Sequence, residues 1–296
     1  MRQWKRMALV FLCCVTLLCG CTAKPANTTE AAAPADMRVV ALSRSIAELW
    51  LLAGGTLTGT TEDAAELDTQ AAVVGSLTAP SLEAILALSP DLVLLSAQLP
   101  VHKEIKAQLD GMRIAARSVN IDSFEDYAFE MIELTALTGR ADLLEQNVTQ
   151  VREKIDSMIA ASPLKDLPQQ ERPTYFAVRV SATKNKALKR DYFACAVFDD
   201  MGLVNIAADN PAFDTLDPEA LLAADPDYIF VIPQGDEAEA QESFQKAFSS
   251  RPVWKNLSAV KAQRVFHMPK ELFQLKPNAN WGEAYQYVLN ILLEKN

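Results

Sequence analysis

The chain has 296 residues, half of them hydrophobic, and a formal net charge of −10 at pH 7. This acidity argues against nucleic acid as a partner, because proteins bind phosphate backbones through an excess of Lys and Arg. The length is sufficient for one large domain or two medium-sized domains with hydrophobic cores.

The N-terminus has the pattern of a secretion signal. Arg2, Lys5 and Arg6 precede the uncharged apolar residues 7–18, a stretch too short to cross a bilayer and of the usual length for a signal-peptide core. Residues 1–20 are therefore predicted to be a signal peptide. Its removal leaves a net charge of −13.

The end of this signal, Leu18-Cys19-Gly20-Cys21, resembles the lipobox of bacterial lipoproteins, although Cys19 is less usual at its position than Ala or Ser. The resemblance implies that Cys21 becomes a lipidated N-terminus, anchored to the cell membrane and facing outside the cytoplasm. Residues 21–36 follow as a small, polar, proline-containing tether. Cys195 is then the only cysteine of the folded body, which excludes an intramolecular disulfide, and its apolar neighbours predict a buried side chain.

From residue 38 the pattern alternates between strand and helix. RVVAL at 38–42 predicts a buried strand, Ser45 to Glu48 has the spacing of a capping box that opens a helix, and VVG at 73–75 predicts another strand. A helix near 101–109 and a strand near 113–119 follow. Residues 37–139 are thus predicted to form an N-terminal α/β lobe with a mostly parallel sheet.

One sequence motif, predicted to form a helix, a turn and a strand, occurs twice. SLEAILALSPDLVLL begins at Ser81, and DPEALLAADPDYIFV begins at Asp217, 136 residues later. In each copy an N-cap residue is followed by an acid in the first turn, Glu83 or Glu219, then by Pro-Asp and a buried strand. This period is far too long for a solenoid, so the repeat predicts two similar lobes with a ligand cleft between them.

Residues 123–161 are almost continuously helical in character, with Gly139 as the one expected break. We interpret residues 140–162 as a long rigid helix that joins the lobes. The second α/β lobe occupies residues 163–296, with strands at 174–180 and 264–268 and a closing helix at 281–294.

Four segments together resemble the substrate-binding lipoproteins of ABC importers that have a rigid helix between two α/β lobes. They are RVVALSRSIAELWLLAG, the passage from VVG to SLEAILALSPDLVLLS, DPEALLAADPDYIFVI, and PVWKNLSAVKAQRVFHMP. The resemblance covers nearly all of residues 38–296. It implies capture of a ferric siderophore, haem or cobalamin, only small opening and closing motions, and no enzymatic activity, cofactor or metal site of the protein's own.

The same resemblance implies the partners. A permease dimer with its ATPase subunits would receive the cargo, and Glu83 and Glu219 would dock into Arg pockets on that permease, one from each lobe. The structural alternative is that each acid only stabilises its own helix, by about 0.3 to 1 kcal/mol, and contacts no partner. We expect the binding protein itself to be a monomer.

The ligand contacts are expected in the loops beyond the carboxyl ends of the strands. In the first lobe these loops contain Arg44 and Ser45, Ser76, and Gln98. The second lobe offers cations beside aromatic residues, which suit a flat or anionic ligand. Its candidates are Arg179, Lys184, Lys189 and Tyr192, followed by Phe273 and Trp281 in a segment that also contains Lys276. A solvated basic loop and a buried helix face are the structural alternatives.

Three other functions remain open. A direct metal binder would need three or four converging ligands, whereas His102 and His267 are the only histidines. An extracytoplasmic enzyme would have to use carboxylates, because no nucleophile or phosphate-binding motif is visible. A ligand-sensing lipoprotein without an importer would share the fold and the cleft.

Overall fold

A computed structural model describes residues 37–294 of the chain. The predicted signal peptide, the predicted lipidation site Cys21 and the predicted tether at 21–36 lie outside these residues. Within them, no helix is long and apolar enough to cross a membrane.

The first sheet has five parallel strands in the order β3-β2-β1-β6-β7. Its strands are β1 (Val39–Ala41), β2 (Gly59–Thr60), β3 (Ala72–Val73), β6 (Leu92–Ser96) and β7 (Ala116–Val119). Because β1 is central, the chain first builds outward through β2 and β3 and then crosses to β6 and β7. The direction of winding therefore changes between β1 and β6. The helices around this sheet are α1 (Arg44–Leu52), η1 (Glu62–Ala64), α2 (Leu82–Ala87) and α3 (Pro100–Gly111), and a small hairpin pairs β4 (Gly75–Ser76) with β5 (Ala79–Pro80).

The second sheet repeats this plan with the order β10-β8-β11-β12, all parallel, and a short β9 antiparallel to β8. Its strands are β8 (Thr174–Val180), β9 (Lys186–Ala187), β10 (Val204–Asn205), β11 (Tyr228–Pro233) and β12 (Val265–His267). The helical elements are η3 (Gln169–Glu171), α7 (Phe193–Asp200), η4 (Pro211–Asp214), α8 (Pro218–Ala224), α9 (Glu237–Phe244), η5 (Gln245–Ser249), η6 (Pro252–Asn256), α10 (Ser258–Lys261), α11 (Lys270–Phe273), η7 (Asn278–Asn280) and α12 (Trp281–Glu294). The two-lobed α/β architecture expected from the repeat is thereby confirmed.

Side chains alternate between two cores along each central strand, as buried parallel strands require. In β8, Tyr175 and Ala177 join the core shared with the long helices, whereas Phe176 and Val178 join a separate core in the second lobe. In the first lobe, Val40 of β1 belongs to the outer core beneath α2 and α3. The shared core reaches both sheets, so the lobes are joined by packing as well as by the chain.

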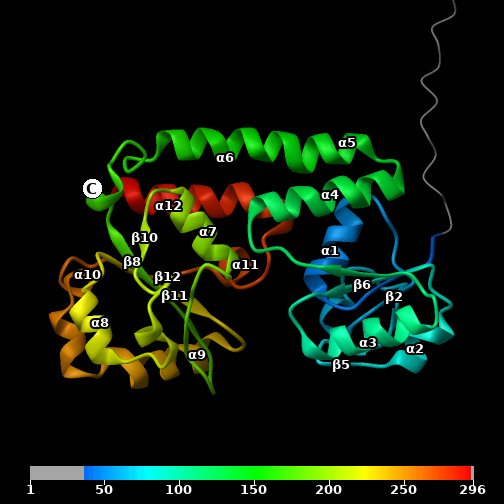
Figure 1. The fold of residues 1–296 in the computed structure, drawn as a ribbon, viewed down its shortest axis with the longest axis horizontal. Coiled ribbons are helices and arrows are strands. Elements are labelled where there is room, and N and C mark those ends of the chain that lie inside the picture. Colours follow the sequence, from blue (N-terminus) through cyan, green and yellow to red (C-terminus); the bar gives the residue numbers. More distant parts are fainter. Residues whose placement is uncertain (1–36, 295–296) are drawn as a thin grey trace, which may run out of the picture. The chain divides into compact units, whose positions relative to one another are not determined.

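The helical stretch between the sheets is broken once. α4 (Phe124–Thr138) ends at Gly139, which has a φ of 71° in the left-handed region. A continuous helical run then passes through α5 (Ala141–Leu144), the π-helical turn η2 (Glu145–Thr149) and α6 (Gln150–Ala161), and α6 packs along α12 (Figure 1). The bidentate pair between Arg152 and Glu125, at 2.5 and 2.8 Å, ties α6 to α4.

The duplicated Pro-Asp has the same structural role in both lobes. Asp91 accepts the backbone N–H of Arg38, just before β1, at 2.8 Å, and Asp227 accepts the backbone N–H of Thr174, the first residue of β8, also at 2.8 Å. Both bonds span 53 residues of sequence. The repeated aspartate therefore fixes the start of each lobe's first strand.

Two details of the predicted elements are wrong. The N-cap of α1 is Ser43, whose hydroxyl accepts the N–H of Ile46, and not Ser45, which lies in the first turn. The strand expected from residue 113 begins at Ala116, because Arg113 has a φ of 61° and closes the turn after α3.

Candidate functional site

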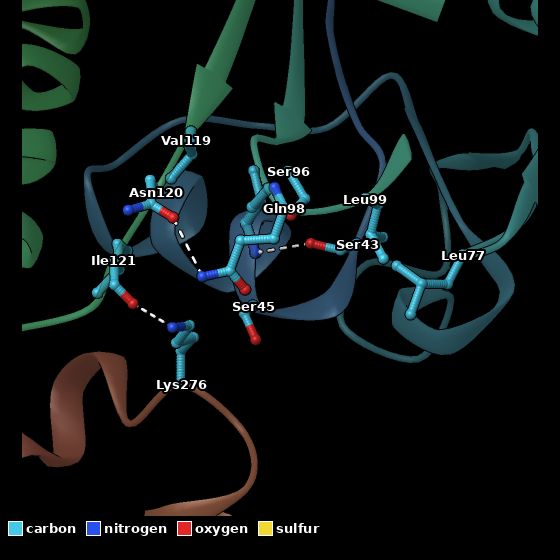
Figure 2. Close-up of a pocket in the computed structure, with 11 residues that line it drawn as sticks. Ser43, Ser45, Leu77, Ser96, Gln98, Leu99, Val119, Asn120, Ile121 and Lys276 are labelled. Carbon is cyan, nitrogen blue, oxygen red and sulfur yellow. Dashed lines mark hydrogen bonds between the residues drawn. The ribbon is translucent and has the colours of Figure 1, made fainter. Parts of the chain in front are cut away.

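A pocket of about 200 Å³ opens at the carboxyl edge of the first sheet (Figure 2). It lies where β1, β6 and β7 end, at the point where the winding direction changes. Open α/β sheets bind ligands at this position, because the loops diverge there and leave a crevice. The lining residues are Ser43, Ser45, Ile46, Leu77, Ser96, Gln98, Leu99, Val119, Asn120, Ile121 and Lys276.

Hydroxyl and amide groups form the polar part of this pocket. The Gln98 amide nitrogen donates to Asn120 Oδ1 at 3.1 Å and to Asp122 Oδ1 at 2.8 Å. Asn120 Nδ2 donates in turn to Asp122 Oδ2 at 2.6 Å. The network holds both amides in place, and the apolar residues around it provide the larger part of the wall.

Lys276 enters the pocket from the segment between α11 and η7 (Figure 2). Its ammonium donates to the backbone oxygen of Ile121 and lies 3.4 Å from Asp122 Oδ1. It also stands over the ring of Phe193, 4.8 Å from the centroid. Burial lowers the pKa of Lys276, and the neighbouring Asp122 opposes that shift. This lysine therefore links the second lobe's tail to the first lobe's pocket.

His102 supports the pocket from behind. The backbone N–H of Ser96 donates to His102 Nδ1 at 3.0 Å, and His102 Nε2 lies 2.9 Å from the carbonyl oxygen of Leu77. Because Nδ1 accepts a hydrogen bond, the proton must be on Nε2 and the ring is neutral. Burial lowers the pKa of His102, in agreement with a neutral ring.

The second lobe has a larger pocket, of about 570 Å³, at the corresponding edge of its own sheet. The ends of β8, β11 and β12 meet α9 and α11 there. The lining residues are Val180, Val231, Pro233, Glu237, Ala238, Gln241, His267, Met268, Pro269, Lys270 and Glu271. Both sheets thus present a hollow at their carboxyl edges, where parallel α/β sheets place their ligand-binding loops.

Of the first-lobe residues predicted to bind ligand, Ser45 and Gln98 line the pocket. Ser76 does not, although its neighbour Leu77 does. Arg44 has another role. It pairs with Glu48 at 3.0 Å and with Glu66 at 2.5 Å, so its charge is held by acids of the first lobe.

The predicted basic cluster of the second lobe does not line either pocket. Lys189 pairs with Asp214 at 2.6 Å, and Lys184 is exposed in a turn closed by Ser181. Arg179 lies over the ring of Tyr192, 5.9 Å from the centroid. The side chains are therefore near the strand ends, but their contacts are with the protein itself.

Phe273 and Trp281 are corrections to the predicted ligand set. Both side chains are fully buried in the shared core. Trp281 packs against Phe124, Tyr127 and Phe193, with ring centroids 6.0 to 6.3 Å apart. Trp281 lies at the joint between the lobes, because residues at helical spacing along α12, such as Trp281, Tyr285 and Val288, face the shared core.

Asn120 and Ile121 are pocket residues that the sequence analysis missed. The available signal was the end of β7, since residues just beyond a buried parallel strand face the ligand crevice. Lys276 was noticed in its segment but not selected, because no sequence pattern places it beside a loop 155 residues earlier.

Within residues 37–294, no group of three or more His, Cys, Asp or Glu side chains is arranged to hold a metal ion. His102 uses both ring nitrogens within the fold, and His267 is an exposed residue at the end of β12. Cys195 is buried, as expected.

Two α/β lobes that share a helical core, each with a hollow at the carboxyl edge of a parallel sheet, define a bilobal solute-binding protein. A family model described as "Periplasmic binding protein" matches residues 39–272. The chain belongs to this family.

Curated relatives with sequence similarity include two proteins named for uptake systems and one named for binding Fe(3+)-citrate. The iron-uptake system-binding protein of Bacillus subtilis is 25% identical over 75% of this chain and 67% of its own length. The Fe(3+)-citrate-binding protein of the same organism is 21% identical, over 67% of this chain and 59% of its own length, so the match spans less than two thirds of that relative. The high-affinity heme uptake system protein IsdE of Staphylococcus aureus is 23% identical, over 71% of this chain and 70% of its own length.

Solved structures share the fold at low sequence identity. An ABC transporter substrate-binding protein from Listeria monocytogenes has a TM-score of 0.73 and 22% identity, with 88% of this chain and 99% of that chain covered. The periplasmic vitamin B12 binding protein of Vibrio cholerae has a TM-score of 0.70 and 19% identity, covering 87% and 97%. These likenesses confirm the two-lobed fold.

Proposed function

We propose that this chain is the extracytoplasmic substrate-binding component of an ABC importer and that its cargo is a metal chelate: a ferric siderophore, haem or a cobalamin. The observation that carries the proposal is the pocket at the β1/β6 switch point in a chain of this family. Relatives are named for iron uptake, Fe(3+)-citrate, heme uptake and vitamin B12. They share a class of cargo, large chelates, and differ in its chemistry.

The proposed organisation follows from this function. Residues 37–139 and 163–296 form the two lobes, residues 140–162 link them, and Cys21 anchors the monomer by its lipid to the cell membrane. Ser45, Gln98 and Lys276 contribute to the cargo site in the first lobe. A sensing lipoprotein without an importer has the same requirements for binding and differs only in delivery.

Delivery depends on Glu83 and Glu219 in this proposal. Each lies in the first turn of a short helix, α2 or α8. The N-cap residue of that helix, Ser81 or Asp217, accepts a hydrogen bond from a backbone N–H of the first turn. Both acids are exposed, and within residues 37–294 neither carboxylate forms an ion pair. An exposed acid at the same position in each lobe suits a permease dimer that offers one Arg pocket to each lobe.

The test is a double charge reversal, Glu83→Lys with Glu219→Lys, in cells that depend on this protein for uptake of a radiolabelled chelate. We expect uptake to fall by more than about tenfold while the affinity of purified protein for the chelate is unchanged, because each lost charge-assisted contact is worth roughly 1.5 to 3 kcal/mol. Glu104→Lys with Glu242→Lys, two exposed acids outside α2 and α8, is the matched control and should transport normally. Unimpaired uptake by the first variant would show that delivery does not depend on these two acids and would overturn their docking role.

A further inference from the structure

The charges around the two pockets define which chelates this site accepts, on the premise that the chain binds a chelate as proposed above. Two lysines line the pockets, Lys276 in the first lobe and Lys270 in the second. A polyanionic cargo requires cations that are free to pair with it, so the present partners of these lysines are decisive.

Lys276 is occupied by the protein. Its ammonium donates to the Ile121 carbonyl, faces the Asp122 carboxylate at 3.4 Å and stands over the Phe193 ring at 4.8 Å, with the side chain 20% exposed. Asp122 is itself held in place by Gln98, so the carboxylate cannot turn away without breaking the amide network. The charge of this lysine is therefore balanced within the fold.

The second-lobe pocket has more carboxylates than cations. Glu237 and Glu271 line it together with one ammonium, Lys270, whose Nζ donates to the backbone oxygen of Gly235 at 2.9 Å. His267 adds little positive charge above pH 7, because an imidazole ordinarily titrates near pH 6.5. An anionic group that entered this pocket would meet an excess of negative charge.

The four cations of the basic stretch after β8 line neither pocket, so they are left out of this balance. Lys189 and Arg190 form ion pairs with Asp214 and Asp209, both at 2.6 Å. A third cation to consider is Arg179, near the end of β8. Its guanidinium lies over the ring of Tyr192.

Even with Arg179 included, the cations at the two strand edges do not outnumber the three carboxylates there. The carboxylates are those of Asp122, Glu237 and Glu271. The chain as a whole has a net charge of −10, which adds a repulsive field for anions at longer range.

We propose that the cargo is a chelate with no net charge or a single charge, and that this site discriminates against polyanionic chelates. The discrimination is negative: Glu237 and Glu271 repel the wrong ligand, while hydroxyl, amide and apolar groups of the first lobe bind the right one. This proposal replaces the expectation of an anionic ligand that the basic stretch of the sequence produced.

The first experiment measures binding of chelates of known charge to the purified protein. Binding is monitored by tryptophan fluorescence. The probes are ferrioxamine B, a monocation, ferrichrome and cyanocobalamin, both neutral, and ferric enterobactin, a trianion. We expect the tightest probe to be neutral or singly charged and to bind at least about tenfold more tightly than the trianion. If the tightest probe is a neutral one, its affinity should also change by less than about twofold between roughly 50 and 500 mM NaCl, because an uncharged ligand has little charge to screen.

Charge-removing variants test the mechanism. Glu237→Gln with Glu271→Gln should strengthen binding of the trianion by about tenfold relative to the neutral probe. Glu242→Gln, on the same helix α9 but outside the pocket lining, is the matched control and should change neither affinity.

The outcomes separate this inference from the proposed function. Tightest binding of the trianion, or no gain for it in the double variant, overturns the charge inference and leaves a chelate-binding protein. Failure of every probe to bind, in a protein that is folded by circular dichroism, contradicts the proposed cargo class and the charge inference together.

Discussion

At the scale of single residues, the polar groups of the first pocket are held by partners within the protein. Lys276 and Asp122 form a pair inside the first pocket, and His102 has each ring nitrogen in a defined hydrogen bond. The histidine connects the end of β6 to the loop at Leu77, and both of these segments line the pocket. Its protonation state should therefore affect both stability and the shape of the pocket.

His102 predicts a loss of stability in mild acid. The folded state keeps the ring neutral, because burial lowers its pKa, whereas an unfolded chain takes up a proton near pH 6.5. The unfolded state thus binds more protons below that pH, so this contribution is complete above about pH 6.5 and is lost as the pH falls toward the folded-state pKa. Denaturation of wild type and His102→Gln between about pH 7.5 and 5.5 should show a smaller pH dependence in the variant, since a glutamine can make both bonds but cannot titrate.

Proton NMR in a His267→Gln background gives the direct measurement, because His102 is then the only histidine of the chain. An imidazole that titrates near 6.5 in the folded protein would refute the assignment. Asp199 and Asp200, whose pKa values are raised by partial desolvation, act in the opposite direction, which is why the comparison must be with the variant and not with wild type alone.

At the scale of elements, local signals predicted most of the chain and failed where contacts are distant. The strand at 174–180 and the helix at 281–294 were predicted with the observed bounds, because β-branched runs and helical periodicity are local. The N-cap of α1 was displaced by two residues, since Ser43 and Ser45 both fit the pattern and only the backbone decides. Trp281 was assigned to the ligand because the sequence does not show which neighbours cover it, and Lys276 was not selected for the same reason.

Gly139 offers a test of an element boundary. Its φ of 71° terminates α4 and turns the chain into α5, a conformation that costs an L-residue about 1 to 2 kcal/mol. Gly139→Ala should reduce the free energy of unfolding by about that amount. Gly111→Ala is the matched control. It lies at the end of α3 with open space around its Cβ, and we expect no loss and up to about 1 kcal/mol of gain. Equal effects of the two substitutions in urea denaturation would contradict this account.

At the scale of the whole molecule, one core extends through both lobes. It contains Ala41 of the first sheet, Phe230 of the second, and the inward faces of α4, α6 and α12. Trp281 lies at the joint, between Phe124 of α4 and Phe193 of α7. Lobes that share a core should move little relative to each other and should unfold together, since separating them would expose these aromatic rings.

Trp281→Ala tests this coupling. Removal of a fully buried indole should cost roughly 3 to 5 kcal/mol, and the affinity for cargo, measured well below the melting temperature, should change by less than about threefold. Trp281→Phe should cost much less, because the buried indole N–H has no hydrogen-bond partner within residues 37–294 and its loss relieves an unsatisfied donor. Trp254→Ala, which empties a site between Phe244 and Phe248 in the second lobe's own core, is the control for loss of an aromatic side chain away from the joint.

Calorimetry should give one transition for wild type and two for Trp281→Ala. If that variant instead retained full stability and lost affinity by more than about tenfold, the indole would belong to the cargo site and the lobes would be held together by other contacts.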